Sequence, residues 1–293
     1  MTDFFLSYLK YQKRVSTHTQ RAYQDDIAAF EAFLLSNFEI NTVAATYREV
    51  RQWMSALAEQ GLSASSINRK MATLRAFYKF MLAEGHITIN PMQKVRAVKM
   101  RKRLPVFVRE DVMAQVFTYE QLFPVGFEGI RDRLVLELLY GTGMRLSELI
   151  GLKNADVNVH AGVIMVLGKR NKQRLIPISG YFRKLIEEYY AIKNKEFLLL
   201  NHESLVVTNK GEPAYPVFIQ RIIKKYLNLM GHNEKASPHV LRHTFATHLL
   251  NNGADINAVK ELLGHANLAA TQVYTHNTFE KLKKAHKQAH PKA

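Results

Sequence analysis

The sequence predicts a mainly α-helical protein with two domains and one small antiparallel β-sheet. Capped segments with apolar residues at helical spacing fill the first 90 residues, and a basic stretch that ends at Pro105 follows them. Beyond this stretch the pattern is again mostly helical, apart from β-rich runs within 157–178. With 293 residues, the chain is long enough to give both domains a hydrophobic core.

The expected first domain, residues 1–90, is a bundle of four helices. After an opening helix, the segment "STHTQRAYQDDIAAFEAFLLSN" starts with a Ser/Thr cap and repeats apolar residues at helical spacing. We expect its buried face to hold Tyr23, Ile27, Phe30 and Leu34. The segments "YREVRQWMSALAEQG" and "SASSINRKMATLRAFYKFMLAEG" supply the other two helices, because they end at Gly61 and Gly85.

Residues 91–106 are expected to connect the domains, since they are basic, poor in large apolar side chains and stopped by a proline. The second domain is expected over residues 107–278, and Arg109-Glu110-Asp111 predicts its first helix. Residues 279–293 carry a short amphipathic pattern. A short helix at a chain end rarely stays ordered alone, so this segment needs a groove on its own domain or on a neighbour.

A formal net charge of +16 indicates an acidic polymer as partner, most often nucleic acid. An anionic membrane surface or ribosomal RNA would match the same charge, but no long amphipathic basic helix or lipidation signal supports the membrane. The first residues lack a long apolar run, so we expect no signal peptide and no membrane insertion. The absence of cysteine is compatible with a reducing compartment, and a cytoplasmic protein is expected.

Six residues of the C-terminal half fit a single site that handles a phosphate group. They are Arg145, Lys169, His239, Arg242, His265 and Tyr274. The two arginines can stabilise phosphate oxygens, because a guanidinium presents a fixed fork of donors. Tyr274 can attack phosphorus and hold it as a covalent ester, while Lys169 can protonate the leaving oxygen. A carboxylate set that would hold magnesium is not evident beside them, so we expect neither a metal nor a cofactor.

The densest part of this set is the segment "HVLRHTFATHLL". Ser237-Pro238 predicts a helix start directly before it. His239, Arg242 and His243 then lie at i, i+3 and i+4, so they share one face of this helix. The buried side is expected to hold Leu241, Phe245, Leu249 and Leu250.

Two further residues of the six, Arg145 and Lys169, also have a predicted local structure. Arg145 follows the Gly-rich turn of "LLYGTG" and opens another helix, with Glu148 one turn further on. Lys169 is expected at the tip of a β-hairpin, because β-rich runs flank the turn "GKRN".

Each residue also has a structural interpretation when it is taken alone. A single arginine or lysine is usually a solvated surface charge, and a lone histidine is more often a hydrogen-bonded structural group. Tyr140 and Tyr226 lie among apolar helix residues and are expected in the core. His239 and His243 could suggest zinc, but no Glu follows His239 and Arg242 would lie beside the cation. It is the joint order and spacing of the six that favours a catalytic site.

In that order and spacing the motifs resemble the tyrosine recombinases, most closely the Xer type that resolves bacterial chromosome dimers. The match consists of Arg145 in "GTGMRLSEL", Lys169 in "GKRNKQR", His239 and Arg242 in "HVLR", His265 in "LLGHAN" and Tyr274 in "VYTH". Glu148 matches a supporting acidic position of the family. The resemblance covers nearly the whole chain and implies the tyrosine recombinase fold, with a SAM-like core-binding domain followed by a catalytic domain.

The resemblance implies a site-specific DNA recombinase whose two domains close as a clamp around duplex DNA. Tyr274 would form a 3′-phosphotyrosine and free a 5′-hydroxyl, and two strand exchanges would pass through a Holliday junction. Arg145 and Arg242 would clamp the phosphate. His265 would hydrogen-bond it, and His239 would assist proton transfer at the tyrosine. Because the bond energy stays in the ester, no ATP or other cofactor is needed.

The implied partners are a double-stranded DNA recombination site and further protomers, in a homotetramer or in a hetero-tetramer with a second recombinase. A septum-associated DNA translocase is a further implied partner, in keeping with chromosome partition at cell division and a nucleoid-associated location. Residues 279–293 would contact the adjacent protomer, since related recombinases donate this helix. A mobile-element integrase and a non-catalytic DNA-binding relative are the alternatives. The chain starts almost directly with the four-helix domain, which favours the Xer type, and a binder would not need the tyrosine.

Basic side chains outside the six are candidates for contacts with the DNA backbone. They lie in the last helix of the first domain, in the linker and in the hairpin: Arg69, Lys70, Arg75, Lys79, Arg101, Lys102, Arg103 and Lys172. The alternative for each group is a solvated basic face or connector. The target DNA sequence cannot be read from these residues, because phosphate contacts carry no sequence information.

Overall fold

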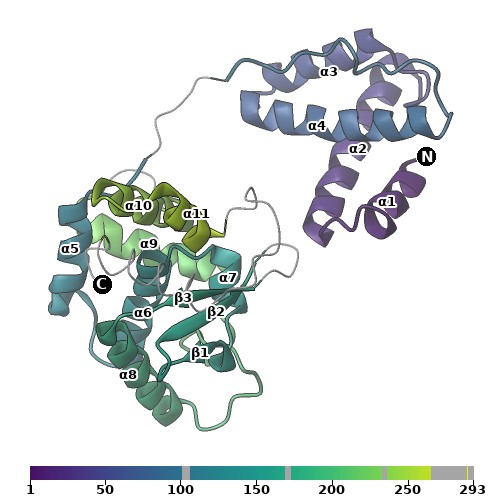
Figure 1. The fold of residues 1–293 in the computed structure, drawn as a ribbon. Coiled ribbons are helices and arrows are strands. Elements are labelled where there is room, and N and C mark those ends of the chain that lie inside the picture. Colours follow the sequence, from purple (N-terminus) through teal and green to yellow (C-terminus); the bar gives the residue numbers. More distant parts are fainter. Residues whose placement is uncertain (101–105, 169–172, 233–235, 265–288, 290–293) are drawn as a thin grey trace. The chain divides into compact units, whose positions relative to one another are not determined.

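The computed structural model describes residues 1–100, 106–168, 173–232, 236–264 and 289 of the chain. The chain divides into two compact units, Met1–Arg103 and Leu104–Ala293 (Figure 1). Within the described residues, no helix is both long enough and apolar enough to cross a membrane.

The first unit is the expected bundle of four helices, labelled in Figure 1 as α1 (Thr2–Tyr11), α2 (Thr17–Phe38), α3 (Tyr47–Glu59) and α4 (Ala64–Ala83). Serine side chains cap two of them, since Ser16 accepts from the Thr19 backbone N–H and Ser63 accepts from that of Ser66. The first backbone N–H groups of a helix lack intrahelical partners, so these caps fix where the helices begin.

Aromatic side chains fill the core of the first unit. Phe5 of α1 meets Phe77 of α4 edge to face, and Phe30 of α2 packs against Trp53 of α3. Three of the four residues expected on the buried face of α2 are confirmed as buried: Ile27, Phe30 and Leu34. The fourth, Tyr23, is partly buried and packs at the edge of the core.

The segment expected as the interdomain linker begins inside this core. Met92 and Val95 are both buried among the side chains of the first unit, and Val98 packs against them. The last helix is tied to the same segment, because the amide of Asn68 donates to the Val98 carbonyl and accepts from its N–H. Residues 91–98 therefore pack as part of the first unit.

The second unit is mostly helical. Its helices are α5 (Glu110–Thr118), α6 (Phe127–Thr142), α7 (Leu146–Gly151), α8 (Gly180–Glu196), α9 (Pro216–Leu229), α10 (Pro238–Asn251) and α11 (Ile256–Leu263), with short 3₁₀ turns at Glu120–Leu122 and Asn154–Asp156. Helix α6 packs against α8 and α10 and is buried along most of its length, which explains its apolar sequence. Tyr140 of α6 and Tyr226 of α9 are both in the core, as predicted.

A three-stranded antiparallel sheet completes the unit, as the sequence predicted. Its strands are β1 (Val157–Asn158), β2 (Val163–Leu167) and β3 (Gln173–Pro177), in the order β1-β2-β3. Strands β2 and β3 pair from Val163 with Pro177 to Leu167 with Gln173, so they form the expected hairpin. Its tip, residues 169–172, lies outside the described residues.

Helix α10 shows both a success and an error of the sequence pattern. It starts at Pro238, and the Ser237 hydroxyl accepts from the Val240 N–H, as predicted. Leu241, Phe245 and Leu249 are buried, but Leu250 is 40 % exposed and does not belong to the buried face. Leu250 follows Leu249 directly, so it points about 100° away from it around the helix.

Candidate active site

Arg145 is placed by the sharp passage from α6 to α7. Helix α6 ends at Thr142 and is capped by Gly143, which has a left-handed conformation with φ of 62°. A Cβ at this position would overlap the ring of Phe245, so both the conformation and the space favour glycine. Arg145 then occupies the N-cap position of α7, where its N–H donates to Glu148 Oε2 and its Nη1 donates to Glu148 Oε1, both at 2.8 Å.

Arg242 connects two helix ends from its position on α10. Its Nη1 donates to the Gly143 carbonyl at 2.5 Å, and its Nη2 donates to the Leu263 carbonyl at 2.6 Å. Gly143 is the C-cap of α6, and Leu263 is the last residue of α11. Carbonyls at a helix C-terminus lack intrahelical partners and lie at the negative end of the helix dipole, so they stabilise a buried guanidinium.

Arg174 of β3 completes this arginine cluster, which consists of Arg145, Arg174 and Arg242. Its Nη1 and Nη2 donate to the two carboxylate oxygens of Glu148 at 2.9 and 2.8 Å, and its Nε donates to the Leu262 carbonyl at 2.9 Å. Arg174 was not among the residues predicted for the site. Its position on β3 carries a signal, because it is an inward position, between outward-facing Gln173 and the core residue Ile176, where an apolar side chain is expected.

The charges of the cluster shift the pKa values of its members. Burial alone would raise the pKa of the Glu148 carboxyl, but hydrogen bonds and the charge of Arg174, with the bonds from Arg145, lower it to about 2. Burial lowers the pKa of Arg242 to about 10, and the positive charges of Arg145 and Arg174 act in the same direction. Three guanidinium groups beside one carboxylate leave an excess of positive charge, which suits an anionic ligand.

Arg145 is the arginine of the cluster that is most open to solvent. Its side chain is 32 % exposed, whereas that of Arg174 is 5 % exposed. Besides Glu148, its Nη2 donates to the carbonyl of Gly264 at 3.2 Å. A bond of this length to a neutral oxygen is weaker than a charge-assisted bond to phosphate, so a phosphate oxygen can replace it.

His239 lies in the first turn of α10, on the rim of a groove of about 510 Å³. The exposed side chains of Arg221 and Lys224 from α9 line the same groove, together with Gln220 and the start of α10. Both basic residues were missed from the sequence, although they recur at i, i+3 on one helix face. A basic groove beside a helix N-terminus is suited to a phosphate backbone.

The remaining predicted residues of the second unit and the linker lie outside the described residues. They are Lys169, Lys172, His265, Tyr274, Arg101, Lys102 and Arg103. Gly264, the residue before His265, is the left-handed cap of α11 with φ of 65°. Within the described ranges, no group of three or more His, Asp or Glu side chains is arranged to hold a metal ion.

Three of the four basic candidates of the first unit have protein partners. Arg69 donates through Nη1 and Nη2 to the carboxylate of Asp26, and Lys70 donates to the same carboxylate at 2.9 Å. Arg75 donates to the Val95 carbonyl at 3.0 Å. Lys79 is exposed, and the side chain of Arg69 is 53 % exposed although it is paired with Asp26.

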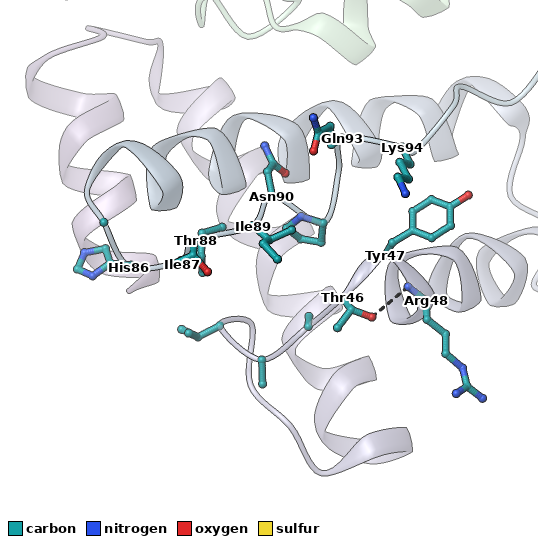
Figure 2. Close-up of a pocket in the computed structure, with 15 residues that line it drawn as sticks. Thr46, Tyr47, Arg48, His86, Ile87, Thr88, Ile89, Asn90, Gln93 and Lys94 are labelled. Carbon is teal, nitrogen blue, oxygen red and sulfur yellow. Dashed lines mark hydrogen bonds between the residues drawn. The ribbon is translucent and has the colours of Figure 1, made fainter.

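A pocket of about 700 Å³ also lies in the first unit (Figure 2). It is formed by residues 43–48, which lead into α3, and by residues 85–94, which follow α4. Thr46 caps α3 here and accepts from the Arg48 N–H, as the dashed line in Figure 2 shows. Apolar side chains such as Ile87 line the pocket beside basic ones such as Lys94, so its chemistry differs from that of the arginine cluster.

Comparison with known proteins shows what these features belong to. Residues 107–281 match the phage integrase family, and residues 3–85 match the N-terminal SAM-like domain of phage integrases. The chain belongs to the phage integrase family. It is 37 % identical over 314 residues to tyrosine recombinase XerC of Chlorobaculum tepidum, covering 99 % of this chain and 94 % of the relative. It is 39 % identical over 293 residues to tyrosine recombinase XerC of Staphylococcus aureus strain USA300, covering 99 % and 96 %.

Solved structures of phage integrase relatives share the fold. The XerH site-specific recombinase in a post-cleavage complex with a palindromic difH substrate matches with a TM-score of 0.74 at 21 % identity, over 97 % of this chain and 84 % of that chain. A lambda integrase dimer bound to a COC′ core site matches with a TM-score of 0.67 at 21 % identity, over 93 % and 97 %. The predicted fold class and the resemblance to Xer-type tyrosine recombinases are therefore confirmed, and with them the class of site-specific recombinase.

Proposed function

We propose that the arginine cluster is the phosphate-binding part of a DNA strand-cleavage site, and that Tyr274 is the nucleophile. The observation that carries this proposal is the convergence of Arg145 and Arg242 on the end of α11, beside Glu148. Two guanidinium groups there can stabilise the charge that develops on the non-bridging oxygens. Glu148 and helix-end carbonyls hold the two guanidinium groups in place, and the long bond from Arg145 to the Gly264 carbonyl opens when the phosphate binds.

In the proposed reaction, the Tyr274 oxygen attacks phosphorus, and a 3′-phosphotyrosine bond forms as the bond to the 5′-oxygen breaks. Lys169 gives a proton to the leaving 5′-oxygen, so a 5′-hydroxyl is released. His239 assists removal of the tyrosine proton, and His265 hydrogen-bonds the phosphate. Attack by a 5′-hydroxyl of the partner strand reverses the step and rejoins the DNA, so the ester bond energy is retained and no cofactor is consumed.

The glutamate of the site has a positioning role in this proposal. Glu148 accepts from both Arg145 and Arg174 while its pKa is held at about 2, so it stays ionised throughout the physiological range. A carboxylate that is always charged keeps the two arginines in fixed orientations. It does not take part in proton transfer, because protonating it at neutral pH would be too costly.

We further propose that the chain resolves dimers of a circular chromosome or plasmid as an Xer recombinase, in a tetramer on two DNA sites. Identity of 37–39 % to XerC proteins over nearly the whole chain supports this role over that of a mobile-element integrase. Partners in this role are a second recombinase or further copies of this chain, and a septum-associated DNA translocase. The segment 279–293 would link neighbouring protomers, and cytoplasmic, nucleoid-associated DNA would be the site of action.

The test is covalent capture of DNA from a library of genomic fragments, followed by sequencing of the captured DNA. We expect one short recurring site, and a nicked version of that site should trap a protein–DNA adduct that resists denaturing gels. Tyr274→Phe should bind the site without forming the adduct, whereas Tyr215→Phe, which changes an exposed tyrosine of the same unit, should form it normally. An adduct with Tyr274→Phe would show that another side chain is the nucleophile.

Chelation tests the metal-free part of the proposal. The arginine cluster supplies the positive charge that a metal ion supplies in many phosphoryl-transfer enzymes. We therefore expect EDTA to leave adduct formation on the nicked site unchanged. Loss of the adduct with EDTA, and its return with added magnesium, would contradict the proposed mechanism.

A further inference from the structure

The three arginines of the cluster bind three successive carbonyls at the end of α11. Arg174 donates to the Leu262 carbonyl, Arg242 to that of Leu263 and Arg145 to that of Gly264, at 2.9, 2.6 and 3.2 Å. Side chains from β3, α10 and the start of α7 thus meet at one helix terminus. Such carbonyls lack intrahelical partners, so each bond satisfies a group that the helix itself leaves open.

Arg174 differs from the other two in how its donors are used. Its side chain is 5 % exposed, and its bonds run to both oxygens of Glu148 on one side and to the Leu262 carbonyl on the other. It is therefore closed to a DNA phosphate. Arg145 and Arg242, by contrast, each bond a helix-end carbonyl through Nη2 without a bidentate carboxylate.

We propose that Arg174 is a positioning residue for DNA cleavage: it fixes Arg145, through Glu148, relative to the end of α11. This inference rests on the proposed function, in which Arg145 and Arg242 bind the phosphate. Glu148 holds Arg145 at 2.8 Å, and Arg174 holds Glu148. The same guanidinium holds the last turn of α11, whose Leu263 carbonyl is the partner of Arg242. Displacing Arg174 therefore changes the positions of both phosphate-binding arginines, Arg145 and Arg242.

The geometry requires arginine rather than a simple positive charge. The planar guanidinium gives two parallel bonds to a carboxylate and a further donor, Nε, from one rigid group. A lysine has a single nitrogen, which cannot span Glu148 and Leu262 in this arrangement. The chain also passes close to Arg174 at Gly264, where a Cβ would lie 3.2 Å from Arg174 Cδ, so the guanidinium and the helix cap fit closely together.

A purely structural role is the alternative, because breaking a buried ion pair destabilises most proteins. The same unit contains a matched control in Arg131, which is 2 % exposed and donates to the neighbouring Asp132 and to Asn209. It lies on α6 and is enclosed by the rings of Phe127 and Phe218. Conservative changes at both arginines should lower stability, but only the change at Arg174 should alter cleavage.

The experiment compares Arg174→Lys with Arg131→Lys in the full-length chain on the nicked DNA site. The cleavage rate constant at saturating DNA and the DNA concentration at half-saturation are measured separately, and both are referred to the fraction folded. We expect Arg174→Lys to lose roughly 10- to 100-fold in the rate constant, because small misplacements of catalytic groups are costly. Its half-saturating concentration should change by less than about twofold, because binding is shared among many phosphate contacts. Arg131→Lys should retain the wild-type rate constant.

Two results would overturn the inference. The first is a folded Arg174→Lys protein that cleaves at the wild-type rate. The second is failure of both Arg174→Lys and Arg174→Gln to fold under conditions in which Arg131→Lys folds, because Arg174 would then be a stabilising residue only. Failure of the proposed function is distinguishable from both, since the wild-type protein itself would then form no adduct at Tyr274.

Discussion

Both units of the protein place a buried carboxylate among basic side chains, but they use it differently. In the first unit Asp26 of α2 accepts from Arg69, Lys70 and Thr73 of α4. In the second unit Glu148 accepts from Arg145 and Arg174. Both carboxyl groups have a lowered pKa, since hydrogen bonds from cations outweigh the effect of burial in each case. Their local electrostatics is therefore similar.

The difference lies in where the remaining donors go. Both terminal nitrogens of Arg69 bond one carboxylate, so this pair fastens α4 to α2 and ends there. The bonds around Glu148 instead continue to carbonyls at the ends of α6 and α11. Neutral carbonyls add no negative charge, so Arg145, which is partly exposed, shares the single carboxylate of Glu148 with Arg174, and positive charge remains in excess. Exposure alone would not reveal this, because Arg69 is 53 % exposed and Arg145 32 %.

The largest effect expected from this difference is on cleavage. Arg145→Ala and Arg242→Ala should each lower the rate of adduct formation by roughly 10²- to 10³-fold, the typical loss when one preorganised donor to a developing charge is removed. DNA affinity should fall far less, because the other phosphate contacts remain. Single-turnover cleavage and equilibrium binding on the same DNA site measure the two effects. Equal losses in rate and affinity would make these arginines anchoring residues.

How far the sequence predicts this arrangement can be judged from particular residues. Ser237-Pro238, the hairpin of β2 and β3 and the helix opened by Arg145 follow from local rules of capping and strand pairing, and the structure confirms them. The convergence of Arg145 and Arg242 was expected from the resemblance to tyrosine recombinases, and its geometry required the tertiary fold.

Arg174 and the partners of Arg69 were not predicted, for a common physical reason. The bonds of Arg174 reach Glu148, 26 positions away in the sequence, and Leu262, 88 positions away. The bond of Arg69 reaches Asp26, 43 positions away. Local periodicity carries no information on such pairs. The predicted roles of Lys169, His265 and Tyr274 remain predictions, because these residues lie outside the described parts of the chain.

The second prediction separates the two carboxylates by changing each to its amide. Asp26→Asn leaves Arg69 and Lys70 without a counter-charge and should lower the free energy of unfolding by roughly 1.5–3 kcal/mol, the value of hydrogen bonds to a charged group. The folded variant should still cleave saturating DNA at the wild-type rate, because Asp26 holds only the first unit together. Glu148→Gln should lower both stability and the cleavage rate. Denaturant unfolding and single-turnover cleavage are the measurements, and a slow Asp26→Asn enzyme would remove the distinction.

The third prediction uses acid to weaken the cluster around Glu148. The pKa of this carboxyl is about 2 in the folded chain and 4.5 ordinarily, so the unfolded chain binds the proton first as the pH falls. The stability that Glu148 contributes is complete above pH 4.5 and is lost as the pH falls from 4.5 towards 2. The loss is on the order of 3 kcal/mol. Urea unfolding between about pH 6 and about pH 3 should show a shallower pH dependence for Glu148→Gln than for the wild type.

The smallest effects, on the salt dependence of DNA affinity, are expected from replacing single basic residues that contact the DNA backbone. These residues allow the surfaces of the two units to be compared as well. Arg221 and Lys224 are exposed on the groove beside His239, whereas Arg75 of the first unit donates to the Val95 carbonyl. Arg221→Gln and Lys224→Gln should each reduce the slope of log affinity against log salt by about one unit, the value for one lost phosphate contact. Arg75→Gln, the matched control, should leave the slope unchanged, because its guanidinium is already committed to the protein. Titrations of one DNA site over a range of salt concentrations measure these slopes. A reduced slope for Arg75→Gln would mean that its bond to the Val95 carbonyl opens for DNA phosphate, in the way proposed for Arg145 and the Gly264 carbonyl, and that Arg75 is a DNA contact and not a control.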